Sequence, residues 1–181
     1  MLDSERPSGR YAHARGHEVG EESRMEEPTG ADEQPFTAPS RKILVIDDTR
    51  SIVIYLTHVL LSLGYTDILT AEDGIEGLEL FYRERPDCVI VDVLMPGLDG
   101  YQVVRTIRGD SSTANTPLII LSAMQQPDKQ LTGLLSGVDE YMGKPFKREE
   151  LGAALDRVMK ITPAEREQRM KRLADGATPN G

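Results

Sequence analysis

The chain has 181 residues, which is enough for one domain of ordinary size with appendages. Its net charge of −9 argues against direct binding of nucleic acid, which requires a basic surface. Its one cysteine excludes an intrachain disulfide, and no stretch approaches the roughly 20 apolar residues of a membrane span. We therefore expect a cytoplasmic protein that contacts neither nucleic acid nor a membrane.

The first 40 residues differ in composition from the rest of the chain. They are rich in Glu, Gly, Pro and Ser, contain almost no Val, Ile or Leu, and carry a net charge of −5. Such a segment cannot bury enough apolar surface to offset the entropy lost on ordering it. The composition predicts a disordered, acidic N-terminal extension over residues 1–40.

Strand and helix signals alternate from Lys42 onward. Short, continuous apolar runs are typical of strands buried on both faces, and apolar residues spaced three or four apart are typical of helices. The predicted order is strand 43–46, helix 52–63, strand 65–71, helix 75–81, strand 88–91, helix 101–108, strand 118–121, helix 128–136, strand 138–142 and helix 151–158. This alternation predicts an α/β fold of the (βα)5 type, a doubly wound five-stranded parallel sheet with helices on both faces.

The tail over residues 162–181 is too short for an independent output domain. Thr162 and Glu165 have the spacing of a helix capping box, with Pro163 at the first helical position. The pattern predicts a brief helix to about Ala174.

Polar side chains follow four of the predicted strands. Asp47 and Asp48 follow the first strand, Asp92 the third, Ser122 the fourth and Lys144 the fifth. In an open parallel sheet, ligands bind beyond these carboxyl ends, so we expect the five side chains to converge. Three carboxylates together repel each other unless a cation such as Mg²⁺ is present, while an ammonium and a hydroxyl suit phosphoryl oxygens. The set predicts phosphoryl transfer to a carboxylate.

In this order the motifs resemble the receiver domains of two-component response regulators, of the stand-alone, single-domain type. The motifs are Asp47-Asp48, Asp92 to Gly97, Ser122-Ala123 and Lys144-Pro145-Phe146. The resemblance covers about residues 41–161 and implies the flavodoxin-like receiver fold. It also implies a phosphoacceptor in a phosphorelay, with a sensor histidine kinase or phosphotransfer protein as the phosphohistidine donor. Such a protein is not an enzyme beyond catalysing its own phosphorylation and dephosphorylation.

The resemblance implies a role for each site residue. Asp92 is the phosphoacceptor. Mg²⁺, with Mn²⁺ as an alternative, is bound by Asp48, Asp92 and the backbone carbonyl of Leu94, and through water by Asp47. Lys144 and Ser122 hold the phosphoryl group, Tyr141 is the switch residue that follows Ser122, and Pro145 follows a cis peptide bond. The implied output is a protein-interaction surface at about residues 129–159, which contacts a downstream protein or forms a homodimer.

Two neighbouring positions, Leu94 and Met124, are apolar where polar groups could orient an attacking water. This suggests a hypothesis of slow intrinsic dephosphorylation.

Other interpretations remain open at this point. Asp47 and Asp48 could simply cap the helix that begins near Arg50, and Tyr141 could be a half-buried structural tyrosine. A phosphohydrolase of the haloacid-dehalogenase type would place a second Asp two residues after the nucleophile, whereas here the two acids are adjacent. A phosphorylation-independent, receiver-like interaction module is the remaining alternative.

Overall fold

The computed structural model describes residues 41–123 and 137–176. The predicted disordered extension over residues 1–40, the predicted helix at 128–136 and Met124 lie outside the described residues.

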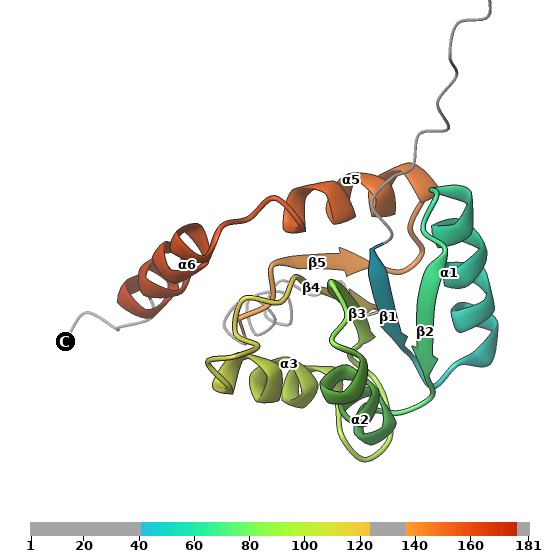
Figure 1. Cartoon of the computed structure of the whole chain (residues 1–181), viewed down its shortest axis with the longest axis horizontal. Coiled ribbons are helices and arrows are strands. Elements are labelled where there is room, and N and C mark those ends of the chain that lie inside the picture. The colour runs from blue at the N-terminus through green and yellow to red at the C-terminus, as the bar shows by residue number, and fades with distance from the viewer. Residues whose placement is uncertain (1–40, 124–136, 177–181) are drawn as a thin grey trace, which may run out of the picture. The chain divides into compact units, whose positions relative to one another are not determined.

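Five parallel strands form one sheet (Figure 1). They are β1 (Lys42–Ile46), β2 (Asp67–Ala71), β3 (Cys88–Asp92), β4 (Leu118–Ser122) and β5 (Glu140–Gly143). Their order in the sheet is β2-β1-β3-β4-β5. The chain adds β2 on one side of β1 and the later strands on the other side, so the strand order switches between β1 and β3. The predicted doubly wound sheet is confirmed.

The helices alternate with the strands as predicted in the described residues. They are α1 (Arg50–Ser62), α2 (Gly74–Glu84), α3 (Gly100–Gly109), α5 (Arg148–Val158) and α6 (Pro163–Gly176). Asp99 caps α3 in a capping box with Gln102, and Gly64 follows α1 in the left-handed region at φ +92°. The second strand begins at Asp67 and not at 65, because the amide of Tyr65 donates to Leu60 O at the end of α1.

The sheet has a hydrophobic core on each face. Side chains alternate along a strand, so Ile43 and Val45 pack with α1 and α5, while Leu44 and Ile46 pack with α2 and α3. Both faces are covered, which explains why the strand sequences are apolar without alternation. The thiol of Cys88 is fully buried in the first of these cores.

A close approach between α3 and β3 shapes the carboxyl edge of the sheet. A side chain on Gly100, the first residue of α3, would collide with the carbonyl oxygen of Asp92. Glycine is therefore required for α3 to begin directly behind the end of β3. In the described part of the chain, none of the helices has the length and apolar character needed to cross a membrane.

Candidate functional site at the carboxyl ends of the strands

The register of the sheet brings the predicted site residues to one edge. Asp92 pairs with Leu121 across β3 and β4, and Ser122 pairs with Gly143 across β4 and β5. Asp47 continues from β1, and Lys144 follows β5 directly. Asp47, Asp92 and Ser122 are buried, with 1%, 6% and 0% of their surface exposed. The predicted convergence is therefore present for these residues.

Lys144 lies between two carboxylates at the centre of the site. Its Nζ is 2.6 Å from Asp47 Oδ2 and 2.7 Å from Asp92 Oδ1. Short contacts of this kind between charged groups are strong hydrogen bonds. One ammonium thus bridges the ends of β1 and β3.

Backbone amides fix the other oxygen of each carboxylate. The amide of Thr49 donates to Asp47 Oδ1 at 2.9 Å, and the amide of Leu94 donates to Asp92 Oδ2 at 2.7 Å. Each carboxylate is therefore held at both oxygens by neighbouring groups, which orients it without help from solvent.

Burial and neighbouring charges shift the titration of this cluster. Burial raises the pKa of Asp92 and the nearby charge of Asp47 adds to this, while the ion pair with Lys144 opposes the change without overcoming it. Burial disfavours the ammonium of Lys144, but its hydrogen bonds to Asp47 and Asp92 outweigh that effect and raise its pKa. The ionised form of Asp92 is thus held in an environment that disfavours it.

The residues fit a hard divalent cation by their chemistry and charge. Three carboxylates and one ammonium leave two negative charges unbalanced at this edge, and oxygen donors are those that Mg²⁺ prefers. Among the described residues, no preformed group of three or more His, Cys, Asp or Glu side chains surrounds a single point. Asp48 is exposed and accepts a hydrogen bond from the Thr49 hydroxyl at 3.3 Å.

The acidic pair does not cap α1. Within the described residues, Asp47 accepts the amide of Thr49, which is the residue before the helix, and Asp48 accepts only its hydroxyl. Helix capping therefore does not account for two adjacent acids at this position.

The remaining predicted residues also lie near this edge. The carbonyl oxygen of Ser122 accepts the amide of Lys144 at 2.7 Å, and the Lys144–Pro145 peptide bond is cis, as predicted. Tyr141 is half-buried and packs against the core that contains Tyr101. Burial, together with the charge and hydrogen bond of Tyr141, raises the pKa of Tyr101 to about 12.

Two features were not predicted from the sequence. One is the direct ion pair between Lys144 and Asp47, a residue for which only water-mediated metal binding was expected. The other is a buried cluster in which Asp139 binds Arg108 and Arg166 at the opposite end of the strands. The sequence placed Asp139 inside the strand predicted over 138–142, whereas the structure begins β5 at Glu140, so no sequence signal pointed to this cluster.

Comparisons with known proteins agree with this arrangement. A family model described as the response regulator receiver domain matches residues 43–156. The probable transcriptional regulator ycf27 of Guillardia theta is 44% identical over 121 residues, which cover 67% of this chain and 46% of that protein. The response regulator MprA of Mycobacterium ulcerans is 39% identical over 126 residues, which cover 70% and 53%. This chain thus spans about half the length of the curated relatives it matches.

Solved structures show the same likeness. A putative response regulator from Chloroflexus aurantiacus has a TM-score of 0.64 at 30% identity, with 67% of this chain and 98% of that chain covered. The receiver domain of a sensor histidine kinase from Pseudomonas aeruginosa, with a magnesium ion coordinated in its active site cleft, has a TM-score of 0.62 at 33% identity, with 67% and 99% covered. The chain belongs to the response regulator receiver domain family.

Proposed function

We propose that the chain is a phosphoacceptor response regulator in which Asp92 takes a phosphoryl group from a phosphohistidine of a sensor histidine kinase or phosphotransfer protein. The observation that carries the proposal is the bridge of Lys144 Nζ between Asp47 and Asp92, at 2.6 and 2.7 Å. This bridge places one cation beside two buried acids, where a phosphoryl group would need it.

The residues have distinct tasks in the proposed step. An oxygen of Asp92 attacks phosphorus, a P–O bond forms, the P–N bond breaks, and its electron pair returns to the imidazole nitrogen. Lys144 exchanges its carboxylate partners for a phosphoryl oxygen, and Ser122 donates its hydroxyl to another. The amide of Leu94, 2.7 Å from Asp92 Oδ2, keeps the carboxylate oriented.

A divalent cation would be held by Asp47, Asp48, Asp92 and the carbonyl of Leu94. When bound, Mg²⁺, or Mn²⁺ in its place, neutralises negative charge on the carboxylates and on the transferred group. The unbalanced charge at this edge supports such an ion.

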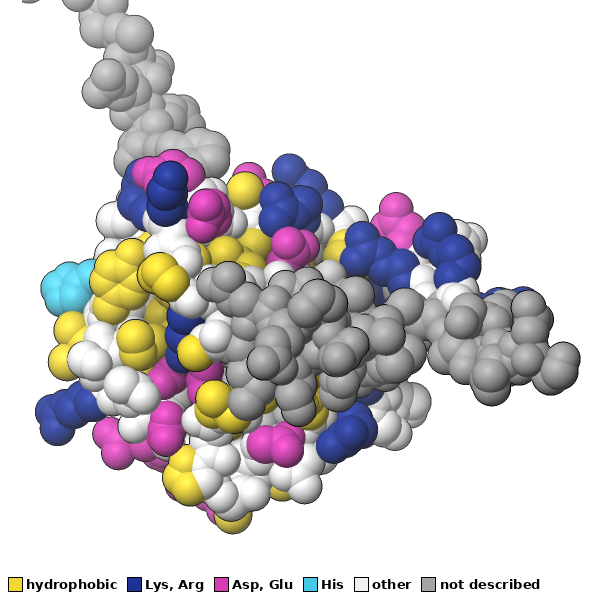
Figure 2. All heavy atoms as spheres, turned by 180° about the vertical axis from the view of Figure 1, so that it is seen from behind, with side chains coloured by type: hydrophobic (Ala, Val, Ile, Leu, Met, Phe, Trp, Pro, Cys, Tyr) yellow, Lys and Arg dark blue, Asp and Glu magenta, His cyan; other side chains and the backbone are white. Residues whose placement is uncertain are grey.

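A surface beside the site suits a protein partner. Ile54, Tyr55 and Leu61 on α1 are 51%, 44% and 48% exposed, and Figure 2 shows hydrophobic side chains on this side of the molecule, at the left of the view. The Tyr55 ring also contacts Phe146, which follows the Lys144–Pro145 peptide, at 5.7 Å between centroids. Exposed apolar patches mark interaction sites, and this one supports docking of the kinase or phosphotransfer protein next to Asp92.

The output belongs to the proposal as well. Phosphorylation shifts the population of a protein-interaction surface formed by residues of β5 and α5, through which a downstream protein or a second copy is contacted. One relative is named a probable transcriptional regulator and another a response regulator, but the match covers only about half of each. We therefore keep the prediction that this chain does not contact nucleic acid directly.

The apolar side chain of Leu94 favours slow hydrolysis of the phosphoryl group on Asp92. Its apolar side chain is 48% exposed two residues after Asp92, and it cannot orient an attacking water. We expect Leu94→Asn to shorten the lifetime of the acyl phosphate, which mass spectrometry after removal of the phosphodonor measures. An unchanged lifetime would remove Leu94 from this role.

The test of the function is the intact mass of the protein after incubation with acetyl phosphate and Mg²⁺. The wild type should gain one phosphoryl mass, and chelation of the metal by EDTA should prevent the gain. Asp92→Asn should gain nothing. Asp110→Asn, which removes a half-buried carboxylate in the turn after α3, is the matched control and should behave as the wild type.

A folded wild type that binds Mg²⁺ but gains no mass would contradict the proposal. It would favour the alternative, a receiver-like interaction module that works without phosphorylation.

A further inference from the structure

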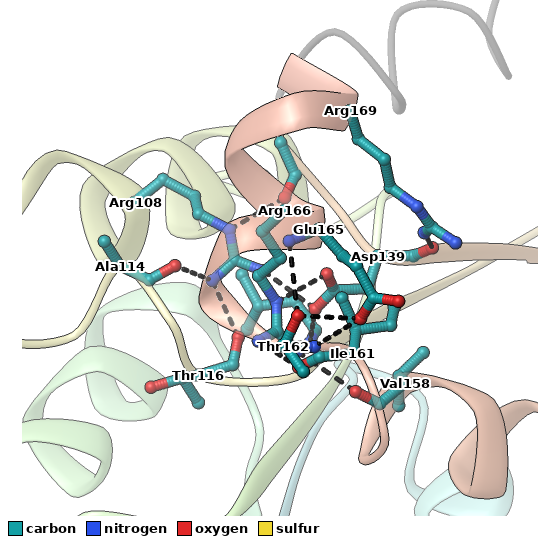
Figure 3. A network of polar contacts seen from close by, with 12 residues as sticks. Arg108, Ala114, Thr116, Asp139, Val158, Ile161, Thr162, Glu165, Arg166 and Arg169 are labelled. Atoms are coloured by element: carbon teal, nitrogen blue, oxygen red, sulfur yellow. Dashed lines mark hydrogen bonds and ion pairs between the residues drawn. The ribbon is translucent and has the colours of Figure 1, made fainter. Parts of the chain in front are cut away.

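Asp139 forms a buried charge cluster at the amino-terminal ends of β4 and β5 (Figure 3). Its side chain is 3% exposed, and it accepts Arg108 Nη2 at 3.0 Å, Arg166 Nε at 2.7 Å and the amide of Leu118 at 2.9 Å. Arg108 comes from α3 and Arg166 from α6. The carboxylate thus joins α6 to the body of the receiver domain.

Arg166 also donates hydrogen bonds to backbone carbonyls at and after the C-terminus of α5. Its Nη2 donates to the carbonyl of Val158 at 3.0 Å, and its Nη1 donates to the carbonyl of Ile161 at 2.9 Å. Val158 is the last residue of α5, where carbonyl groups lack partners within the helix. One side chain of α6 therefore satisfies a carboxylate, the end of α5 and the connecting loop.

The described side chains of α6 other than Arg166 are exposed. Among the α6 side chains that the structure describes, Arg166 is the only one that is buried. A cavity of about 900 Å³ lies beside it, lined on one side by Pro163, Ala164 and Glu167 and on the other by Ala114, Asn115 and Val138. Figure 2 shows Lys and Arg side chains gathered over this end of the molecule. Among the side chains of α6 that the structure describes, those that hold the helix do so by polar contacts, namely the contacts of Arg166 and the hydrogen bond from Arg169 Nη1 to the carbonyl of Asp139 at 3.3 Å.

The strand β5 connects this cluster to the phosphorylation site. Asp139 immediately precedes β5 and Lys144 immediately follows it, so the two are roughly 16 Å apart along an extended chain. Among the strands of the described residues, β5 lies at the edge of the sheet and pairs with β4. A shift of Lys144 from Asp47 and Asp92 towards a phosphoryl group would therefore pull on the residue that holds Arg166.

We propose that α6 is a releasable helix, latched by Arg166 to Asp139, and that phosphorylation of Asp92 loosens this latch through β5. The proposal rests on the proposed function for its trigger. The docked position of α6 belongs to the arrangement in which Lys144 binds Asp47 and Asp92. Because coupling between two sites is reciprocal, loosening α6 should in turn favour the phosphorylated arrangement.

The test is hydrogen–deuterium exchange of the full chain, read in α6 and, as an internal reference, in β1. Phosphorylation with acetyl phosphate and Mg²⁺ should speed exchange in α6 by about fivefold or more and leave β1 unchanged. The phosphoryl mass is recorded on the same sample. An adduct with unchanged α6 exchange would overturn the coupling.

Failure of the proposed function gives a different result, namely no adduct. In that case Lys144→Met, which breaks the ion pairs at the carboxyl end without phosphorylation, decides the coupling. Faster exchange in α6 supports it, and unchanged exchange refutes it.

The latch itself is tested by Arg166→Met, with Arg172→Met as the control that removes an exposed α6 charge lacking any contact with Asp139. Arg166→Met should speed α6 exchange and also tighten binding of beryllofluoride with Mg²⁺ by about fivefold. Arg172→Met should do neither. Equal exchange in the two variants would show that Arg166 is not a latch.

Discussion

The two ends of the sheet each bury a carboxylate against cations, but the balance of charge is opposite. At the amino end, one carboxylate, Asp139, meets two guanidiniums, from Arg108 and Arg166. At the carboxyl end, two buried carboxylates, Asp47 and Asp92, share the single ammonium of Lys144.

The two ends also differ in how far hydrogen bonds from the protein satisfy their charged groups. Arg108 donates to the carbonyls of Ala114, Thr116 and Gly137 as well as to Asp139, so each nitrogen of its guanidinium has a partner in the protein. The carboxyl end is left with excess negative charge, which a divalent cation would neutralise. Buried charged groups are tolerated in a fold when hydrogen bonds from the protein satisfy them, so the hydrogen-bonded first cluster holds elements together, whereas the second keeps charge available for chemistry.

The largest effect is expected from Asp139→Asn. This change leaves two guanidiniums at a buried site without their counterion and should lower the free energy of unfolding by about 3–5 kcal/mol. Urea denaturation followed by circular dichroism measures it.

Glu140→Gln is the matched control for that variant. Its carboxylate pairs with Arg157 at 2.8 Å, but the two side chains are 27% and 57% exposed, so its removal should cost at most about 1 kcal/mol. Similar losses in the free energy of unfolding for Asp139→Asn and Glu140→Gln would show that the burial of Asp139 does not make its ion pairs more important than the exposed pair of Glu140.

Binding of Mg²⁺ at the carboxyl end of the sheet should raise the free energy of unfolding, and this gain should not depend on the charge cluster at the amino end. At a concentration about 100 times its Kd, the ion should add about 2.7 kcal/mol to the free energy of unfolding. The gain should be the same in Arg166→Met and much smaller in Asp92→Asn. Thermal or urea unfolding with and without Mg²⁺ measures this, and an equal gain in Asp92→Asn would place the ion elsewhere.

Asp92→Asn should stabilise the metal-free protein, by about 0.5–2 kcal/mol. The amide removes a buried charge that Asp47 repels, and Lys144 keeps its contact with Asp47. Urea denaturation in EDTA measures the gain. A clear loss of stability would mean that the pairing of Asp92 with Lys144 outweighs the cost of its burial.

Sequence patterns suffice for the order of strands and helices along the described chain, for the parallel sheet and for the position of the site. The apolar runs identify buried strands, and the acids, serine and lysine directly after them must meet because parallel strands end at one edge. The family resemblance implied the cis bond before Pro145, a local motif predicted the capping box at Thr162, and both are present.

The charge clusters were harder to predict because they depend on distances across the fold. Nothing near Arg166 in the sequence indicates Asp139, which is 27 residues away and becomes its partner only when α6 lies beside the start of β5. The contact between Asp47 and Lys144 spans 97 residues, and whether the ammonium meets one acid or two depends on side-chain geometry. Motifs place residues at an edge, whereas packing decides which of them pair.

The smallest effect concerns pH and refines the comparison of Asp92 with its Asn variant. Burial and Asp47 raise the folded-state pKa of Asp92 above its unfolded value of about 3.9, so the folded protein binds this proton more tightly than the unfolded chain does. The contribution of Asp92 to stability is therefore greatest at low pH and falls as pH rises from the unfolded to the folded pKa. Lys144, whose pKa is raised, remains charged throughout this acidic window.

The stability advantage of Asp92→Asn, measured as the difference in urea midpoints in EDTA, should grow across the window and stay constant above it. An advantage that shrinks with rising pH would mean that the folded protein favours the ionised form of Asp92.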